Sequence, residues 1–344
     1  MAARTIQIAP ANDLHVHFRQ DNAEMLRSVV KHTSRRCARA LVMPNTKIPV
    51  TTGEHVVRDR GKIKAYSGYM EPLMTIKIDA NCTPEKVREA KLAGAIAGKI
   101  YPEGLTTNSE GGITRDMFYE MPVSFQDVLN EMEDCGMILC LHGEMPGVET
   151  LERENIFLNW LDKTLYLFPK LKFVMEHITT QTAVEYIKAY SLDNLAATIT
   201  VHHLILTLDD IIGDKLNPHA FCKPVPKLRK DRASLIEAAT SGNPRFFLGT
   251  DSAPHLRGNK ECAAGCAGVY TAPVMTEALV ELFDELGVLD RLENFMTRFG
   301  EQYYGLTPVD GKITLSEEDW HVPDQIDGVV PLYAGEKLKW RING

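Results

Sequence analysis

The feature of this sequence that most limits its possible folds is a regular alternation of short β-prone runs with segments that carry helical signals. The β-prone runs span residues 13–18, 39–44, 72–79, 95–101, 137–142, 171–178, 195–201 and 245–250. Strands that alternate with helices predict a parallel α/β protein, and a count of eight favours a (β/α)8 TIM barrel over an open doubly wound sheet. No G-x-G-x-x-G motif follows the first run, which also counts against a dinucleotide-binding fold.

Helix signals between the runs support this prediction. Thr83 offers an N-cap that is followed by a first-turn proline, and Ser124 with Asp127 resembles a capping box for a helix that Gly136 would end. From about residue 305 onward the chain is rich in turn residues. We therefore expect residues 1–304 to form the barrel and residues 305–344 to form a short appendage of strands packed on it, not an independent domain.

Charge and cysteine content limit the possible partners. The formal charge of −8 and the pI of about 5.8 argue against nucleic acid and against an anionic membrane. No apolar stretch has membrane length, so we expect a cytoplasmic protein. The seven cysteines include no C-x-x-C pair, which suits a reducing compartment. Cys262 and Cys266 could join a metal site, although a loop pair without partner histidines is more often two simple thiols.

Polar residues stand where several of the runs end. His15 and His17 are two residues apart, so on a strand both imidazoles point to the same side. His142, His177 and Asp251 end the fifth, sixth and eighth runs. Each histidine alone could be a hydrogen-bonded core residue, and the aspartate could cap a turn. Because active sites of such barrels lie at the carboxyl ends of the strands, the set together predicts a transition-metal site, with zinc as first candidate.

Lys99 ends the fourth run, after a small and apolar stretch. Five ligands exceed what one catalytic zinc needs, which suggests two ions, and a charged ammonium would be repelled by two dications. A deprotonated lysine can add CO2 to form an anionic carbamate that bridges two metals. The alternative is a lysine that reaches solvent or pairs with a carboxylate such as Glu103.

The order of these residues resembles the binuclear amidohydrolase superfamily. Within it, the chain is similar to the short, single-function (class II) dihydroorotases, from about residue 13 to about residue 306. The resemblance rests on the segments MPNTKIPVTT, KIYPEGLTTNSEGGIT, LHGE, EHITT, FCKPVPK, LGTDSAPH and CAGVYTAP. Only 14 residues precede His15, whereas longer relatives usually carry a β segment there, which also favours the short type.

This resemblance implies zinc-dependent, reversible hydrolysis of (S)-dihydroorotate to N-carbamoyl-L-aspartate, a step of pyrimidine (UMP) synthesis. One zinc would be held by His15, His17, N6-carboxylated Lys99 and Asp251, and the other by Lys99, His142 and His177. A hydroxide that bridges the two metals would attack the ring, with Asp251 as general acid and base.

The resemblance also implies contacts to the substrate and a homodimeric assembly. Arg19 has the planar, charged fork that suits the carboxylate outside the ring. The remaining substrate contacts would be made by Asn45, Thr106, Thr107, His142, Lys223, His255 and Ala267, of which Lys223 and Ala267 would act mainly through the backbone. Lys223 departs from the leucine common in bacterial relatives. The segment around Thr106 and Thr107 would close over the substrate.

Some alternatives stay open on the sequence alone. Another cyclic-amide hydrolase, such as a hydantoinase or allantoinase, has the same ligand set but need not bind an exocyclic carboxylate as Arg19 would. A metal-free scaffold relative should have lost some ligands, whereas all six positions are present here. His202 and His203 end the seventh run, and we place both outside the predicted metal shell, as neighbours of the site or as packing residues.

Overall fold

The computed structural model describes residues 4–20 and 22–343, and its centre is a sheet of eight parallel strands. The strands pair in chain order, as listed here: β2 (Ala11–Val16), β3 (Cys37–Val42), β4 (Glu71–Ile78), β5 (Ala95–Ile100), β6 (Ile138–His142), β7 (Phe173–Glu176), β8 (Leu195–Ile199) and β9 (Phe246–Leu248). The main-chain amide of Asp251 donates to the carbonyl of His15 (2.8 Å), and that of His17 donates to Ser252 (3.1 Å). These bonds join the two ends of the sheet, and the predicted (β/α)8 barrel is confirmed.

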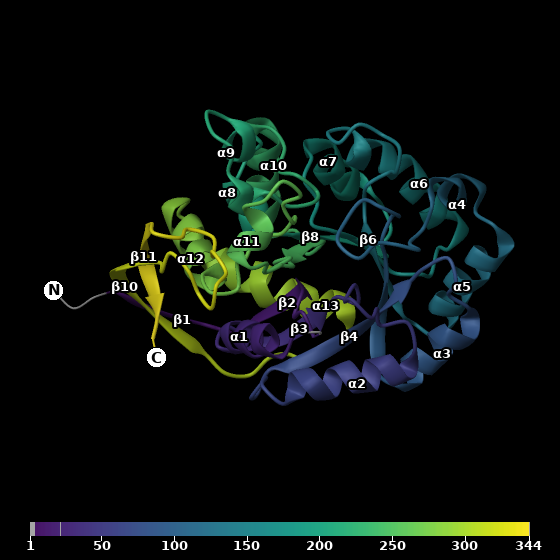
Figure 1. The fold of residues 1–344 in the computed structure, drawn as a ribbon, viewed down its shortest axis with the longest axis horizontal. Helices are drawn as coiled ribbons and strands as arrows, with labels where there is room; N and C mark the ends of the chain where they lie inside the picture. The colour runs from purple at the N-terminus through teal and green to yellow at the C-terminus, as the bar shows by residue number, and fades with distance from the viewer. Residues whose placement is uncertain (1–3, 21, 344) are drawn as a thin grey trace.

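The helices that cover the barrel follow the strands in turn (Figure 1). They are α1 (Ala23–Ser34), α2 (Gly53–Lys64), α3 (Pro84–Leu92), α4 (Arg115–Glu120), α5 (Val123–Asp134), α6 (Arg153–Leu167), α7 (Gln181–Ala189), α8 (Val201–Ile205), α9 (Asp209–Ile212), α10 (Arg229–Thr240), α11 (Arg257–Lys260), α12 (Met275–Glu285) and α13 (Phe299–Tyr304). Short turns of 3-10 helix lie at Pro218–Ala220 and Leu289–Arg291, and a π-helical turn lies at Asn294–Arg298. No helix in the described ranges is both long enough and apolar enough to cross a membrane.

The predicted helix starts are partly right. The hydroxyl of Thr83 caps α3 by accepting from the amide of Lys86, with Pro84 in the first turn, as predicted. The capping box at Ser124 is wrong, because α5 begins at Val123 and the N-cap position is occupied by Pro122, two residues before Ser124. The proline side chain has no hydrogen-bond acceptor, so this helix begins without a side-chain cap.

A second, three-stranded antiparallel sheet joins the two ends of the chain. Its order is β1 (Thr5–Ile8), β10 (Ile313–His321) and β11 (Lys337–Ile342), and the first of these strands was not predicted. The amide of Lys339 on β11 donates to Glu281 on α12, which fastens the sheet to the barrel (2.9 Å). Figure 1 shows β1 beside β10 and β11, far from β6 and α5. The division at residue 304 stays a prediction, since the appendage includes a strand from the N-terminal end.

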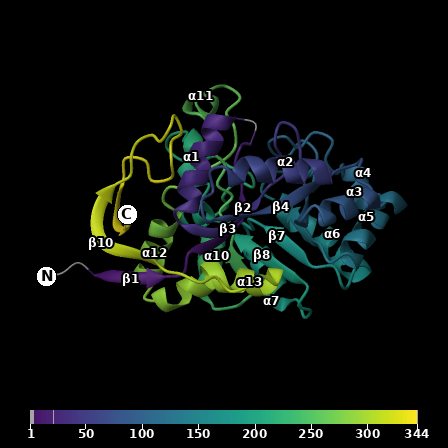
Figure 2. The same cartoon turned by 90° about the horizontal axis from the view of Figure 1, so that it is seen from below.

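Two apolar layers hold the fold together. The larger lies between the strands and the surrounding helices, an arrangement that Figure 2 shows with α2, α3 and α6 outside the strands. The smaller fills the barrel and contains Leu14, Leu41, Met43, Leu73, Ala97, Ile138, Cys140, Val174, Ala196 and Phe247. Phe299, Tyr303 and Tyr304 pack against this inner cluster. A filled interior of this kind leaves only the end of the barrel for polar chemistry.

Candidate metal centre and substrate pocket

A layer of polar side chains lies directly above the apolar packing inside the barrel. Each of the strands β5 to β8 places a polar residue two positions after a residue of the inner apolar cluster. The pairs are Ala97 and Lys99, Cys140 and His142, Val174 and Glu176, and Ala196 and Thr198. Because side chains two residues apart on a strand point to the same side, this polar layer faces the barrel axis at the carboxyl ends.

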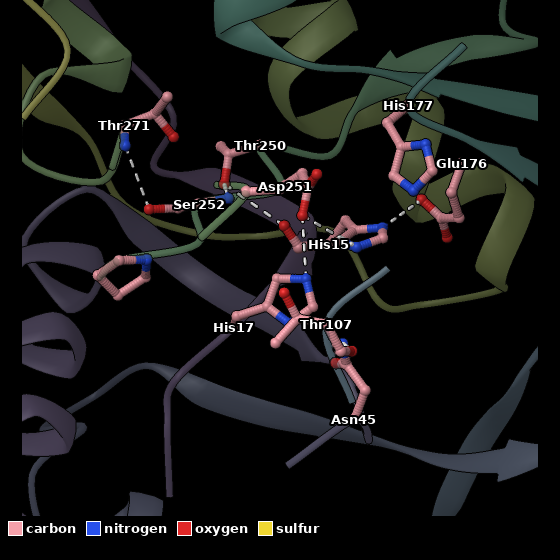
Figure 3. A network of polar contacts seen from close by, with 12 residues as sticks. His15, His17, Asn45, Thr107, Glu176, His177, Thr250, Asp251, Ser252 and Thr271 are labelled. Carbon is pink, nitrogen blue, oxygen red and sulfur yellow. Dashed lines mark hydrogen bonds and ion pairs between the residues drawn. The ribbon is translucent and has the colours of Figure 1, made fainter. Parts of the chain in front are cut away.

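The predicted metal ligands meet at this layer. Ligand atoms of His15, His177 and Asp251 all lie within 4.8 Å of one another. The Nε2 atom of His17 lies 3.0 Å from the Oδ1 atom of Asp251, and the rings of His142 and His177 have centroids 4.8 Å apart. All five side chains are buried. Figure 3 shows Asp251 between His15 and His17, with His177 on the far side of His15.

Lys99 is enclosed without a hydrogen-bond partner. Its side chain is 0% exposed, and its Nζ atom contacts no acceptor among the described residues. Its Nζ atom lies 5.3 Å from the centroid of the Tyr101 ring. Burial lowers the pKa of this amine, although Glu176 and Asp251 act in the opposite direction. The alternative in which Lys99 reaches solvent or pairs with Glu103 is therefore wrong.

The buried polar atoms of this cluster fit a metal centre. Besides Lys99, the Nδ1 atom of His177 and one carboxylate oxygen each of Glu144 and Glu176 have no hydrogen-bond partner in the described chain. Leaving buried polar groups unpaired is costly, and imidazole nitrogens with carboxylate oxygens are the ligands that zinc prefers. The residues present thus suit divalent transition metals.

Two buried carboxylates orient the ligands, and the sequence had not indicated them. Glu176 contacts Nδ1 of His15 at 2.9 Å and accepts from the hydroxyl of Thr198 at 2.6 Å. Glu144 contacts Nε2 of His142 at 2.7 Å. Each contact leaves the other ring nitrogen for a metal and sets the tautomer of that ligand. Both acids stand one or two residues from a predicted ligand, but an acidic neighbour is too common in sequences to be informative by itself.

Three predicted site residues have a backbone conformation that is rare outside glycine. The φ angles of Arg19, His177 and Asp251 are 54°, 44° and 46°. Such left-handed conformations cost free energy and tend to occur at functional sites, where the surrounding structure enforces them. The left-handed His177 directly follows the end of β7 at Glu176, and Asp251 lies three residues after the end of β9 at Leu248. The ligands follow these strands and are not part of them.

The protonation states of the ligands also suit metal binding. Burial lowers the pKa of His17 to about 4, against the opposing effect of Asp251. Burial alone would raise the pKa of Asp251, but the neighbouring imidazoles of His15 and His17 outweigh it and keep that pKa below its usual value. A neutral imidazole and an ionised carboxylate are the forms that bind metals.

A pocket opens above the predicted metal ligands and brings the predicted substrate residues together. Its lining includes Arg19, Asn45, Tyr101, Thr106, Thr107, Lys223, Ala253, Ala267 and Gly268. His255 lies at its edge, where its Nε2 atom is 3.0 Å from Nη2 of Arg19 and 3.1 Å from the carbonyl oxygen of Ala267. Burial and the charge of Arg19 lower the pKa of His255 to about 3. The guanidinium of Arg19 is thus next to a neutral imidazole.

The segment of residues 103–112, here called the pocket loop, is held against the barrel. Asn45 donates from Nδ2 to the carbonyl of Thr107 (2.9 Å) and accepts at Oδ1 from the hydroxyl of Tyr101 (3.0 Å). Buried Lys77, on β4, donates from Nζ to the carbonyls of Asn108 (3.3 Å) and Glu110 (2.8 Å). The sequence had not indicated Lys77 or Tyr101 as site residues. These contacts keep Thr107 beside Asn45 and His17 (Figure 3).

His202 and His203 lie apart from the predicted ligand set. We expected them to end a strand, but the structure places them in α8, whose first turn is capped by the Thr200 hydroxyl. Both are buried, and their ligand atoms gather with the thiol of Cys222 instead of with His15. Cys262 and Cys266 belong to neither group of candidate ligands in the described ranges.

Comparison with known proteins supports one family. No family model matches the chain. A dihydroorotase from Azoarcus sp. (strain BH72) is 45% identical over 98% of this chain and 99% of that protein. The crystal structure of a dihydroorotase from Saccharomyces cerevisiae in complex with 5-fluoroorotic acid has a TM-score of 0.91 at 33% identity, covering 99% of this chain and 98% of that one.

A bacterial crystal structure leads to the same result. Dihydroorotase from Campylobacter jejuni has a TM-score of 0.90 at 36% identity, covering 100% of this chain and 99% of that one. Relatives this similar over nearly their full lengths share the fold. The chain belongs to the dihydroorotase family, whose members are hydrolases that act on cyclic amides.

Proposed function

We propose that this protein is a dihydroorotase that uses two zinc ions to interconvert (S)-dihydroorotate and N-carbamoyl-L-aspartate. The observation that carries the proposal is that five of the six predicted ligands, all except buried Lys99, line a pocket that also contains Arg19. A ligand set alone would fit many amidohydrolases. The guanidinium above it adds recognition of a carboxylate outside the ring.

The first part of the proposal concerns the metals and Lys99. One ion would be held by His15, His17 and Asp251. The other would be held by His142 and His177, and carboxylated Lys99 would bind both ions. In the neutral form that burial favours, the Lys99 amine attacks CO2, which forms an N–C bond and releases one proton. When bound, the two ions lower the pKa of a water molecule and polarise a carbonyl group.

The chain's own residues then guide the hydrolysis. Asp251 takes the proton of the attacking water at a carboxylate oxygen and gives it to the ring nitrogen as the amide C–N bond breaks. In ring closure the same carboxylate acts in the opposite sense. Glu176 and Glu144 keep His15 and His142 in the tautomers that leave one ring nitrogen for metal.

Substrate orientation is the task of the pocket. Arg19 is held by a bond from its Nε atom to the carbonyl of Pro254 (3.1 Å), which aims the guanidinium, and His255 lies against its Nη2 atom. The substrate carboxylate would pair with this fork, next to Asn45. Thr106 and Thr107 would cover the ring and keep bulk water out. Lys223 and Ala267 would contribute mainly backbone groups.

An assay with paired substrates tests the proposal. The zinc-loaded protein should open dihydroorotate, lose this activity on chelation and recover it with zinc. Activity on hydantoin without activity on dihydroorotate or carbamoyl-aspartate would reject the substrate assignment. For Lys99, electron density for an unmodified side chain in a crystal that holds both metals would reject the carbamate.

The resemblance also suggests where and in what form the protein works. We propose a homodimer in the cytoplasm, consistent with seven cysteines that form no disulfide and suit a reducing compartment. Light scattering of the purified protein measures the oligomeric state, and a mass equal to one chain would contradict the dimer.

A further inference from the structure

We propose that His202, His203 and Cys222 form an additional, buried metal site, separate from the two ions of the proposed catalytic centre. The three residues come from α8 and from the segment that follows Phe221, and all are buried. Their ligand atoms lie within 4.8 Å of one another. The ligand set of one thiolate and two imidazoles is that of a soft or borderline transition metal, zinc above all.

The spacing of two of the proposed ligand atoms fits one metal ion. The Sγ atom of Cys222 lies 3.8 Å from Nε2 of His203. The carbonyl oxygen of Pro224 lies 3.4 Å from Sγ and 3.0 Å from Nε2. With zinc bonds of about 2.0–2.3 Å, tetrahedral ligands are about 3.3–3.8 Å apart. The separation of Sγ and Nε2 lies at the upper end of this range, and the carbonyl oxygen of Pro224 now holds the two groups side by side through hydrogen bonds.

His202 provides the second, independent observation. Its side chain is 0% exposed, and neither Nδ1 nor Nε2 has a hydrogen-bond partner in the described ranges of the chain. Its ring centroid is 4.4 Å from that of His203. A buried imidazole with two unpaired nitrogens is costly unless something binds it, and a metal held by its two neighbours would do so.

The surrounding groups allow the protonation change that binding requires. His203 already contacts Thr200 through Nδ1 (2.9 Å), so a shift of its proton from Nε2 to Nδ1 frees Nε2 and keeps a hydrogen bond to that hydroxyl. The Cys222 thiol releases one proton to become the ligand. Burial raises the pKa of this thiol, whereas the cations Lys260 and Lys227 act against that effect. The bound metal completes the change, because coordination deprotonates a thiol outright.

Such an ion would have a structural role. It would join α8 to the Cys222–Pro224 segment, and this segment includes Lys223 in the lining of the substrate pocket. The site does not depend on the proposed function, because none of its ligands is among the six of the catalytic centre.

Cobalt gives a specific test. The protein is produced in cells grown with Co2+ in place of zinc, so that metal is present before the cluster becomes buried. The catalytic ligand set contains no sulfur, so a near-ultraviolet thiolate-to-cobalt charge-transfer band reports the additional site alone. We carry out the test in a Cys262→Ser/Cys266→Ser background, which removes the two neighbouring thiols.

The expected result is a charge-transfer band that disappears in Cys222→Ser and persists in Cys37→Ser, a control at another buried cysteine. Zinc-grown Cys222→Ser should contain one metal equivalent less than its parent, with the catalytic pair retained. His202→Gln is a second variant that leaves the thiol in place, and it should also lose that equivalent. A folded parent without the band, or a band that survives Cys222→Ser, would overturn the proposal. Loss of activity with the band intact would count against the catalytic proposal and leave this site standing.

Discussion

The metal-ligand side of the pocket is built on the ends of strands, whereas the side that carries Thr106 and Thr107 is built on a loop. On the ligand side, buried carboxylates fix side chains, as Glu176 fixes His15. On the loop side, side chains from the barrel hold main-chain carbonyls, as Lys77 holds that of Glu110. A ligand must be placed to fractions of an ångström, while a cover has to open, so the two sides need different kinds of support.

The two buried lysines give the largest expected contrast. Lys99→Ala removes the bridge between the two proposed metals, whose effect on the transition state is several kcal/mol, so kcat/KM should fall by about 10³-fold or more. Metal content should fall as well, and a small carboxylate such as acetate should restore part of the activity by filling the space. Lys77→Met is the matched control for loss of a buried lysine. Equal activity of Lys99→Ala and the parent would contradict the proposed role of Lys99 as a bridge between the metals.

The carboxylates of the ligand side should have the next largest effect. Glu176→Gln keeps the shape but removes the charge that orients His15, and it should weaken zinc binding about 10–100-fold. Competition with a chromophoric chelator measures this affinity. Glu144→Gln, the matched variant beside His142, should weaken the other ion instead. If both variants weaken the same ion, the proposed division of the ligands is wrong.

The loop side should show smaller effects on a different parameter. Lys77→Met removes two hydrogen bonds from a charged group to the pocket loop, each of about 1.5–3 kcal/mol, and this loss is partly offset by new contacts with water when the loop opens. We expect KM for dihydroorotate to rise roughly 10-fold with metal content unchanged. Cleavage of the loop by proteases should become faster. Lys77→Arg keeps the cation and should retain most of the parent's KM, and a loss of metal in Lys77→Met would contradict the separation of the two sides.

Acid stability should show the smallest effect, and it compares a predicted metal ligand, His17, with His255 at the edge of the pocket. The folded-state pKa values of His17, about 4, and His255, about 3, lie below the ordinary 6.5. In this window the unfolded chain binds protons that the folded chain does not, so stability falls as pH falls from 6.5 towards these values. In metal-free protein, His255→Gln should recover about 1–2 kcal/mol at pH 4, measured by urea unfolding. Bound zinc should prevent protonation of His17, whereas the loss of stability caused by His255 should remain. Identical urea-unfolding curves of the parent and His255→Gln at pH 4 would refute this prediction.

Much of the ligand side could be read from the sequence because strand geometry is local. Side chains two apart share a face, and parallel strands bring their carboxyl ends together, so His15, His142 and Asp251 were expected at one site. The barrel prediction followed from the same regularity. The strand β1 was missed because it has only four residues and pairs with β10 at the other end of the chain.

Other features depended on the tertiary structure. Glu176 reaches His15 across 161 positions, and Lys77 reaches the pocket loop from a neighbouring strand. No local pattern marks such partners, because the chemistry of a carboxylate or an ammonium is the same on a solvated surface. Likewise, Cys222 lies 19 positions from His203, and only the packing of α8 brings them together. The sequence by itself determined the order of the barrel strands and predicted metal ligands at or just after the ends of these strands. The tertiary structure decided which buried groups orient them, since burial and long-range contact are properties of the folded chain alone.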